Sequence, residues 1–257
     1  MNALLSIKDV SMVFGGLRAV DKVNMEVMPG EIHALIGPNG AGKTTVINVV
    51  GGFYKPTEGT ILFDGVPIQG LKSSTISRAG IARTFQNVRL FKGLTVLENV
   101  QIGMYSQIKE GIIGTIFRTP YFHRVNKEAT QECMNLLELV GLQDKAHYKA
   151  CNLSYGQQKV VEIARALAQK PKLLLLDEPA AGLNDTETTE LIKLVQGLQD
   201  RGITILLIEH NMRFVMNLSD QITVVNFGKK IAEGAPAQIQ INEEVIEAYL
   251  GKRRVYA

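Results

Sequence analysis

One nine-residue stretch constrains this chain most tightly, Gly37-Pro38-Asn39-Gly40-Ala41-Gly42-Lys43-Thr44-Thr45. It follows the apolar segment 32–36 and precedes a second one, 46–50, so the predicted order is strand, glycine-rich loop and helix. In such a G-x-x-x-x-G-K-T loop, backbone N–H groups and the free amides of the helix start can surround phosphate oxygens. Lys43 adds a positive charge and the Thr44 hydroxyl is a ligand for Mg²⁺. The stretch predicts a nucleoside triphosphate site rather than an ordinary glycine-rich turn.

Composition excludes several other classes of protein. Among the 257 residues, 46% are hydrophobic and 21% are charged, which is ordinary for a globular protein with a substantial core. The net charge of +3 is too small to indicate a nucleic-acid partner. Cys133 and Cys151 form no C-x-x-C motif and no His/Cys cluster, so we expect neither a disulfide framework nor a zinc site. We find no signal peptide and no apolar run long enough to cross a bilayer. We therefore expect a cytosolic-facing protein that reaches a membrane only through a partner.

The apolar pattern predicts an α/β protein with a helical insertion. Alternating residues indicate strands, continuous apolar runs indicate buried parallel strands, and a helical period covers the middle of the chain. The predicted strands are 4–13, 19–28, 60–63, 81–86, 173–176, 203–208 and a hairpin over 222–232. The predicted helices include 96–100, 129–139, 156–169, 186–201 and 243–250, with a break within 111–124 and a basic tail at 252–254. We expect a single domain, 1–257, in which residues 1–87 and 160–257 form an α/β lobe and residues 88–159 a helical lobe.

Polar residues at predicted strand ends supply the chemistry that the loop lacks. Asp177 follows a buried strand, where a second carboxylate that directs Mg²⁺ belongs, and the adjacent Glu178 is placed to orient a water for attack on the γ-phosphate. His210 ends a neighbouring strand and can contact the γ-phosphate and hold that water with Glu178. Gln86 can ligate Mg²⁺. Taken alone, an Asp-Glu pair or a histidine at a strand end is more often structural. Their occurrence together with the loop at Lys43 favours a functional role instead.

The segment 152–158, Asn-Leu-Ser-Tyr-Gly-Gln-Gln, resembles the signature motif of ATP-binding-cassette (ABC) ATPases. The order of loop, Gln86, signature, Asp177-Glu178 and His210 is also that family's order. The resemblance implies an α/β P-loop NTPase fold with a RecA-like parallel sheet, an antiparallel β subdomain and an inserted helical subdomain. It also implies head-to-tail dimers that bind ATP and Mg²⁺. In these dimers Ser154, Gly156 and Gln157 of one subunit complete the nucleotide site of the other, and Phe14 stacks on the adenine.

Two departures from the family pattern and three further segments refine the resemblance. Tyr155 stands where the signature usually has glycine, and Asn184 stands where the dimer-contact loop more often has aspartate, which leaves the coupling between subunits open. The segments 14–20, 83–91 and 179–184 are similar to branched-chain amino-acid import ATPases. Residues 119–124 are similar to an insertion in the longer of that system's two ATPases.

This resemblance implies an ATP-hydrolysing subunit that powers a separate integral-membrane permease from the cytoplasmic face of the cell membrane. Its partners are a second ATPase, either identical or distinct, the permease subunits and, indirectly, a solute-binding protein. Urea or amide import and lipopolysaccharide export are the alternatives among related systems. A small-molecule P-loop kinase shares only the loop and has no use for residues 153–158. A cassette protein that works on DNA or ribosomes usually has a second cassette or a long coiled coil, and the chain has neither.

Overall fold

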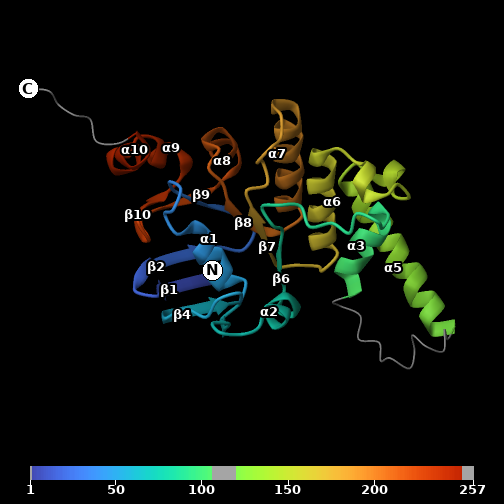
Figure 1. The fold of residues 1–257 in the computed structure, drawn as a ribbon, viewed down its shortest axis with the longest axis horizontal. Coiled ribbons are helices and arrows are strands. Elements are labelled where there is room, and N and C mark those ends of the chain that lie inside the picture. The colour runs from blue at the N-terminus through green and yellow to red at the C-terminus, as the bar shows by residue number, and fades with distance from the viewer. Residues whose placement is uncertain (1, 106–119, 251–257) are drawn as a thin grey trace, which may run out of the picture.

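The computed structural model describes residues 2–105 and 120–250, and within them two sheets meet around helix α1 (Figure 1). The larger sheet has the strand order β10-β9-β3-β8-β7-β6. Its strands from β9 to β6 are parallel, and only β10 pairs antiparallel with its neighbour. Its strands are β3 Ile32–Ile36, β6 Ile81–Arg83, β7 Leu173–Asp177, β8 Thr204–Ile208, β9 Gln221–Asn226 and β10 Lys229–Gly234.

The smaller sheet is antiparallel and has the order β2-β1-β4-β5. Its strands are β1 Leu5–Phe14, β2 Leu17–Val27, β4 Glu58–Phe63 and β5 Val66–Pro67. Buried and less buried residues alternate in β2 from Val23 to Val27, as predicted for a strand with one covered face, whereas β1 has two runs of three buried residues, 5–7 and 10–12, next to its register shifts. The combination of a parallel core sheet and an antiparallel β subdomain confirms the predicted fold class.

Three hydrophobic clusters hold these layers together. The central strands β3, β7 and β8 are buried along their whole length, so successive side chains enter opposite cores. One cluster contains Leu35, Leu175 and Leu206 together with residues of α1 and the smaller sheet. The second contains Ile36 and Leu176 together with residues of the helices on the other face. The third cluster lies among α3, α5 and α6, which gather at one end of the molecule in Figure 1.

The helices agree with the predicted pattern where that pattern was long and periodic. Their bounds are α1 Lys43–Val50, α2 Ser73–Ala79, α3 Val96–Tyr105, α5 Pro120–Leu139, α6 Tyr155–Leu167, α7 Asp185–Gln199, α8 Met212–Leu218, α9 Pro236–Gln240 and α10 Glu243–Leu250. The short helices α2, α8 and α9 were not predicted, because seven residues or fewer show too little of a helical period. Across the described residues, no helix has both the length and the apolarity needed to span a bilayer.

Three predicted segments need correction or fall outside the described residues. The prediction of a strand over 81–86 is wrong beyond Arg83: the last pairing with β7 is the Thr84 N–H donating to the Leu175 carbonyl, and Gln86 lies in the exposed loop that follows. Most of the predicted break within 111–124 lies outside the described residues, as does the basic tail at 252–254. The lobe boundary at 159/160 stays a prediction; it falls inside α6.

Candidate active site

The phosphate loop connects β3 to α1, and two of its glycines are required by close backbone contacts. A Cβ at Gly37 would lie 2.0 Å from the Val225 carbonyl oxygen, and one at Gly42 would lie 2.5 Å from that of Ala19. Gly42 also has φ 101°, in the left-handed region that favours glycine, at the N-cap of α1. The loop therefore lies pressed against neighbouring backbone, with the N-terminus of α1 behind it.

The Lys43 ammonium is held inside this loop. Its Nζ donates to the carbonyl oxygens of Gly37, at 2.7 Å, and Pro38, at 2.9 Å, and the residue is 6% exposed. The pKa of Lys43 is lowered, because the effect of burial exceeds the opposite effect of the nearby carboxylates of Glu178 and Asp177. The charge is thus fixed at the inner side of the loop, where phosphate oxygens would compete with two backbone carbonyls for it.

A concavity of about 210 Å³ opens over the loop. It is lined by Ala19, Asn39, Gly40, Ala41, Gly42, Lys43, Thr44, Thr45 and Glu178. Seven of these residues belong to the stretch 37–45, Ala19 belongs to β2, and Glu178 directly follows β7. The structure therefore places residues 39–45 of the predicted loop and the predicted water-activating carboxylate in one hollow, which Gly37 and Pro38 do not line.

Glu178 is the point at which three predicted residues meet. Gln86 Nε2 donates to Glu178 Oε2 at 2.7 Å, and His210 Nδ1 lies 3.7 Å from the same oxygen. The parallel pairing of β6, β7 and β8, which Gln86, Glu178 and His210 follow, explains the convergence, because the carboxyl ends of these strands lie at one edge of the sheet. Glu178 has φ 49°, a backbone conformation that is costly for a residue with a side chain and that clusters at functional sites.

Asp177 has a partner that the sequence did not predict. Arg83 Nη2 donates to Asp177 Oδ2 at 2.7 Å, with both side chains largely buried, and Arg83 Nη1 donates to Asn48 Oδ1 in α1 at 2.7 Å. The guanidinium also lies 5.2 Å from the ring centre of Phe53 and 5.3 Å from that of Phe85. Arg83 thus ties α1 and the end of β7 together and fixes one oxygen of the predicted metal ligand.

Two of the three residues predicted to bind Mg²⁺, Thr44 and Asp177, have side chains that suit this ion; the third, Gln86, donates its amide to Glu178. Asp177 lies at the carboxyl end of β7, and the exposed Thr44 is in the first turn of α1, so both supply hard oxygen ligands. Among the described residues no group of three or more His, Cys, Asp or Glu side chains could hold a metal by itself. Mg²⁺ usually takes one or two protein oxygens and completes its shell with phosphates and waters, which matches this sparse set.

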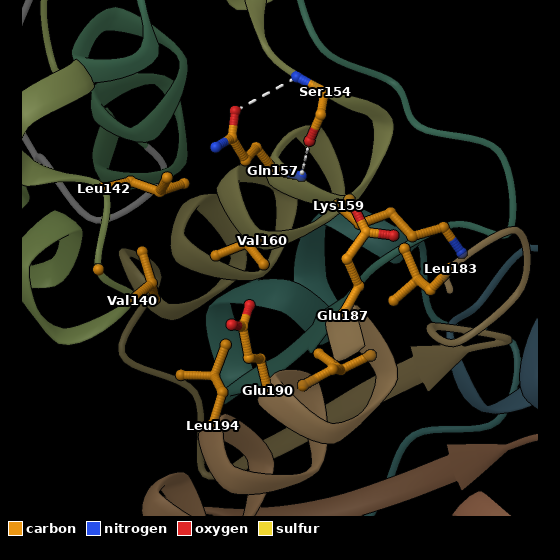
Figure 2. Close-up of a pocket in the computed structure, with 13 residues that line it drawn as sticks. Val140, Leu142, Ser154, Gln157, Lys159, Val160, Leu183, Glu187, Glu190 and Leu194 are labelled. Carbon is orange, nitrogen blue, oxygen red and sulfur yellow. Dashed lines mark hydrogen bonds between the residues drawn. The ribbon is translucent and has the colours of Figure 1, made fainter. Parts of the chain in front are cut away.

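The signature residues form a second, separate hollow (Figure 2). Ser154 is the N-cap of α6: its hydroxyl accepts from the Gln157 N–H, and the Gln157 side chain accepts from the Ser154 N–H, each at 3.3 Å. Ser154, Gly156 and Gln157 line a cavity of about 250 Å³ that shares no lining residue with the hollow at Lys43. The structure therefore does not bring these residues to the phosphate loop of the same chain.

Phe14 and two unpredicted residues complete the account of the site. Phe14 ends β1, is 39% exposed and packs against Tyr54 with the two rings nearly perpendicular and 5.3 Å between their centres; it does not line the hollow at Lys43. Lys159 is buried in α6 and donates to the carbonyls of Glu178 and Pro179. Glu209, fully buried, accepts from three backbone N–H groups, those of Ala180, His210 and Asn211. The only sequence signal for either residue was its position, since Lys159 follows the signature segment 152–158 and Glu209 precedes His210.

Comparison with known proteins gives matches over nearly the whole chain. A family described as "ABC transporter" matches residues 20–181, and one described as "Branched-chain amino acid ATP-binding cassette transporter" matches residues 229–255. The high-affinity branched-chain amino acid transport ATP-binding protein LivG of Escherichia coli (strain K12) is 50% identical over 250 residues, which cover 97% of this chain and 98% of LivG.

Solved structures agree with these sequence matches. An ATP-binding cassette of an ABC transporter in its ADP conformation superposes with a TM-score of 0.86 at 34% identity, covering 98% of this chain and all of that one. A bacterial ABC transporter cassette described as dimeric has a TM-score of 0.77 at 26% identity, over 90% of this chain and 98% of the other. Fold, motif order and relatives thus agree, and the chain belongs to the ATP-binding proteins of ABC transporters.

Proposed function

We propose that this chain is the ATP-hydrolysing subunit of an ABC importer for branched-chain amino acids. The observation that carries hydrolysis is the hollow in which the phosphate loop faces Glu178, with Gln86 and His210 at that carboxylate. The cargo is supported by the 50% identity to LivG, a branched-chain amino acid transport protein, over almost the full length of both chains. It is further supported by the second family match near the C-terminus.

Within this proposal the predicted residues divide nucleotide binding and hydrolysis among them. The loop amides and Lys43 bind the β- and γ-phosphates, and Phe14 stacks on adenine. Glu178 orients a water and takes its proton as the water oxygen attacks the γ-phosphorus. The bond from the γ-phosphorus to the bridging oxygen breaks, and ADP and phosphate leave. His210 contacts the γ-phosphate, and Gln86 links the occupied site to the loop that leads into the helical lobe.

Mg²⁺ is the proposed cofactor, held by Thr44 and Asp177 with Gln86 as a third candidate ligand. When bound, it would neutralise negative charge on the β- and γ-phosphates. Asp177 keeps one oxygen for this purpose while Arg83 holds the other. Arg83 therefore limits how the carboxylate can rotate.

The separate hollow at Ser154 supports a shared site between two subunits. Ser154, Gly156 and Gln157 present the N-terminus of α6, which favours anions, yet they share no hollow with Lys43 of the same chain. In a head-to-tail dimer the α6 start of one subunit covers ATP on the other. The partner ATPase is either an identical copy or a distinct cassette.

The remaining partners follow from family membership. We place the chain at the cytoplasmic face of the cell membrane, bound to integral permease subunits that receive substrate from a solute-binding protein. Residues 88–159 form the lobe that contacts the permease, and residues 1–87 and 160–257 form the nucleotide-binding lobe. Related systems for urea, amides or lipopolysaccharide use the same ATPase chemistry and differ in cargo.

Two experiments test this proposal at separate levels. Purified protein is incubated with MgATP and no acceptor, and phosphate release is measured; turnover supports a cassette ATPase, whereas strict dependence on a nucleoside or sugar acceptor supports a kinase. Cells that lack this chain are then tested for uptake of labelled leucine, isoleucine and valine against urea. Loss of branched-chain uptake that the wild-type gene restores and the Lys43→Ala gene does not is the expected result. Unchanged branched-chain uptake with lost urea uptake would reassign the cargo.

A further inference from the structure

A buried lysine links the signature helix to the catalytic strand end. Lys159 lies in the second turn of α6 and is 5% exposed, and its Nζ donates to the carbonyl oxygens of Glu178 at 2.8 Å and Pro179 at 3.1 Å. The pKa of Lys159 is lowered, because the effect of burial exceeds the opposite effect of the surrounding carboxylates, chiefly those of Glu209 and Glu162. The ammonium thus donates to the backbone of the turn that follows β7, residues 178–182, rather than to any one carboxylate.

That turn carries the unusual backbone conformation of Glu178. A φ of 49° persists in a residue with a Cβ only where its surroundings hold it. The Glu178 N–H donates to the Ile208 carbonyl at 2.9 Å, and its own carbonyl accepts from both Lys159 and the Ala181 N–H. On the other side of the turn, Glu209 accepts from the Ala180 N–H at 2.8 Å. The turn is therefore held from β8 on one side and from α6 on the other.

Tyr155 adds a second contact between α6 and the same turn. Its ring lies one helical turn before Lys159, with Nζ 5.5 Å from the ring centre. A Cβ placed on Gly182, which has φ 79°, would lie 3.0 Å from Tyr155 Cε1, so the ring packs directly over that glycine. Tyr155 was noted above as a departure from the usual glycine of the signature. A glycine at position 155 could make neither contact.

We propose that Lys159, supported by Tyr155, is a positioning residue that makes the geometry of Glu178 depend on the position of α6. The inference rests on the proposed function, in which Ser154 at the start of α6 binds ATP on the partner subunit. Closure of that contact moves the N-terminus of α6, and Lys159 carries the displacement to the Glu178 backbone of its own site. The two nucleotide sites of a dimer are thereby coupled through one helix.

The test compares Lys159→Met, which keeps length and apolar bulk but removes the donors, with Lys159→Arg, which keeps donors and charge. Lys170→Met is the matched control, because its exposed side chain pairs with Glu132 at the surface. We expect Lys159→Met to lower kcat about tenfold, as loss of a charged hydrogen bond implies, with the Kd for a fluorescent ATP analogue within about twofold. The Hill coefficient for ATP falls towards one. Lys159→Arg restores most of the rate, and Lys170→Met matches the wild type.

Each other outcome counts against the inference. An unchanged kcat in Lys159→Met, or an equal loss in Lys159→Arg, overturns it, and a parallel fall in kcat and nucleotide affinity indicates general disruption instead. If Lys159→Met does not fold, Tyr155→Ala takes its place, since that ring is 44% exposed. We expect about threefold lower kcat in Tyr155→Ala and no change in Tyr155→Phe; wild-type turnover in Tyr155→Ala overturns the inference. Absence of ATPase activity in the wild type would instead reject the proposed function.

Discussion

Gln86 and Glu178 stand 92 positions apart in the sequence, yet the Gln86 amide donates to the Glu178 carboxylate at 2.7 Å. One residue follows β6 and the other follows β7, which pair in parallel, so the same sheet edge brings both together. Gln86 also begins the loop that leads to α3 and the helical cluster. A displacement of that loop therefore changes a direct contact of the carboxylate that we assign to water activation.

The first prediction concerns the charge inside the phosphate loop. Lys43→Ala removes a charge-assisted phosphate contact worth about 1.5–3 kcal/mol, so ATP should bind about tenfold to a hundredfold more weakly. Equilibrium binding of a fluorescent ATP analogue measures the loss. Lys172→Ala is the control, because its side chain is exposed and pairs with Asp64. ATP affinity in Lys43→Ala equal to that of the wild type would contradict the role of this loop in phosphate binding.

The second prediction concerns Phe14, which packs against Tyr54 at the end of β1. Phe14→Ala should weaken ATP binding by about 1–3 kcal/mol, because base stacking on an aromatic ring is lost. Inorganic triphosphate, which has no base, should bind Phe14→Ala and the wild type alike. Phe14→Tyr keeps the ring and should keep the affinity. Equal losses for ATP and triphosphate would show that Phe14 supports the loop rather than the adenine.

The third prediction concerns the start of α6. Ser154→Arg should leave ATP binding to the isolated chain unchanged, because Ser154 lies outside the hollow at Lys43. It should prevent association of two cassettes on addition of ATP, since a large cation replaces a small capping hydroxyl at the proposed contact. Light scattering with and without ATP, alone and with a co-purified partner ATPase, measures this. A dimer that still forms in Ser154→Arg would contradict the shared site.

The fourth prediction concerns the two free cysteines. Cys151 is exposed and should react with a thiol reagent within seconds at pH 8, whereas Cys133 is fully buried in α5 and should react only on unfolding. Burial raises the pKa of Cys133 from 9.0 to about 11, so the folded state retains a proton there that the unfolded state releases. Its contribution to stability is therefore complete below pH 9 and is lost as the pH rises towards 11.

The measurement is denaturant unfolding between pH 8 and 11 of the wild type and Cys133→Ala. We expect the wild type to lose more stability over this range than the variant, because only the wild type releases the Cys133 proton on unfolding. Cys151→Ser serves as the control and should follow the wild type. Parallel pH profiles for wild type and Cys133→Ala would show that the thiol does not titrate on unfolding.

Much of the site was predictable because its parts lie at the ends of strands that the sequence marks clearly. Buried parallel strands read as continuous apolar runs, and the polar residue after each run reaches a common edge. This reasoning placed Asp177, Glu178 and His210 together with the loop at Lys43. The glycines of the loop were predictable for a different reason, since few other sequences allow that backbone path.

The remaining parts could not be predicted because they depend on tertiary contacts without a local pattern. Arg83 pairs with Asp177, which lies 94 positions later in the sequence. Lys159 donates to backbone carbonyls, which carry no sequence signal. The strand at 81–86 was predicted too long because β6 loses its partner after Thr84, which depends on where β7 lies. Short helices such as α2 and α8 are stabilised by packing more than by periodicity.

The most direct test of the account is ATP hydrolysis by Glu178→Gln at saturating MgATP, measured as phosphate release with no acceptor. Glu138→Gln, an exposed carboxylate on α5, is the control. We expect Glu178→Gln to bind ATP as tightly as the wild type and to release phosphate at least about a hundredfold more slowly, because the group that accepts the water proton is gone. Phosphate release at the wild-type rate by Glu178→Gln would contradict the central claim.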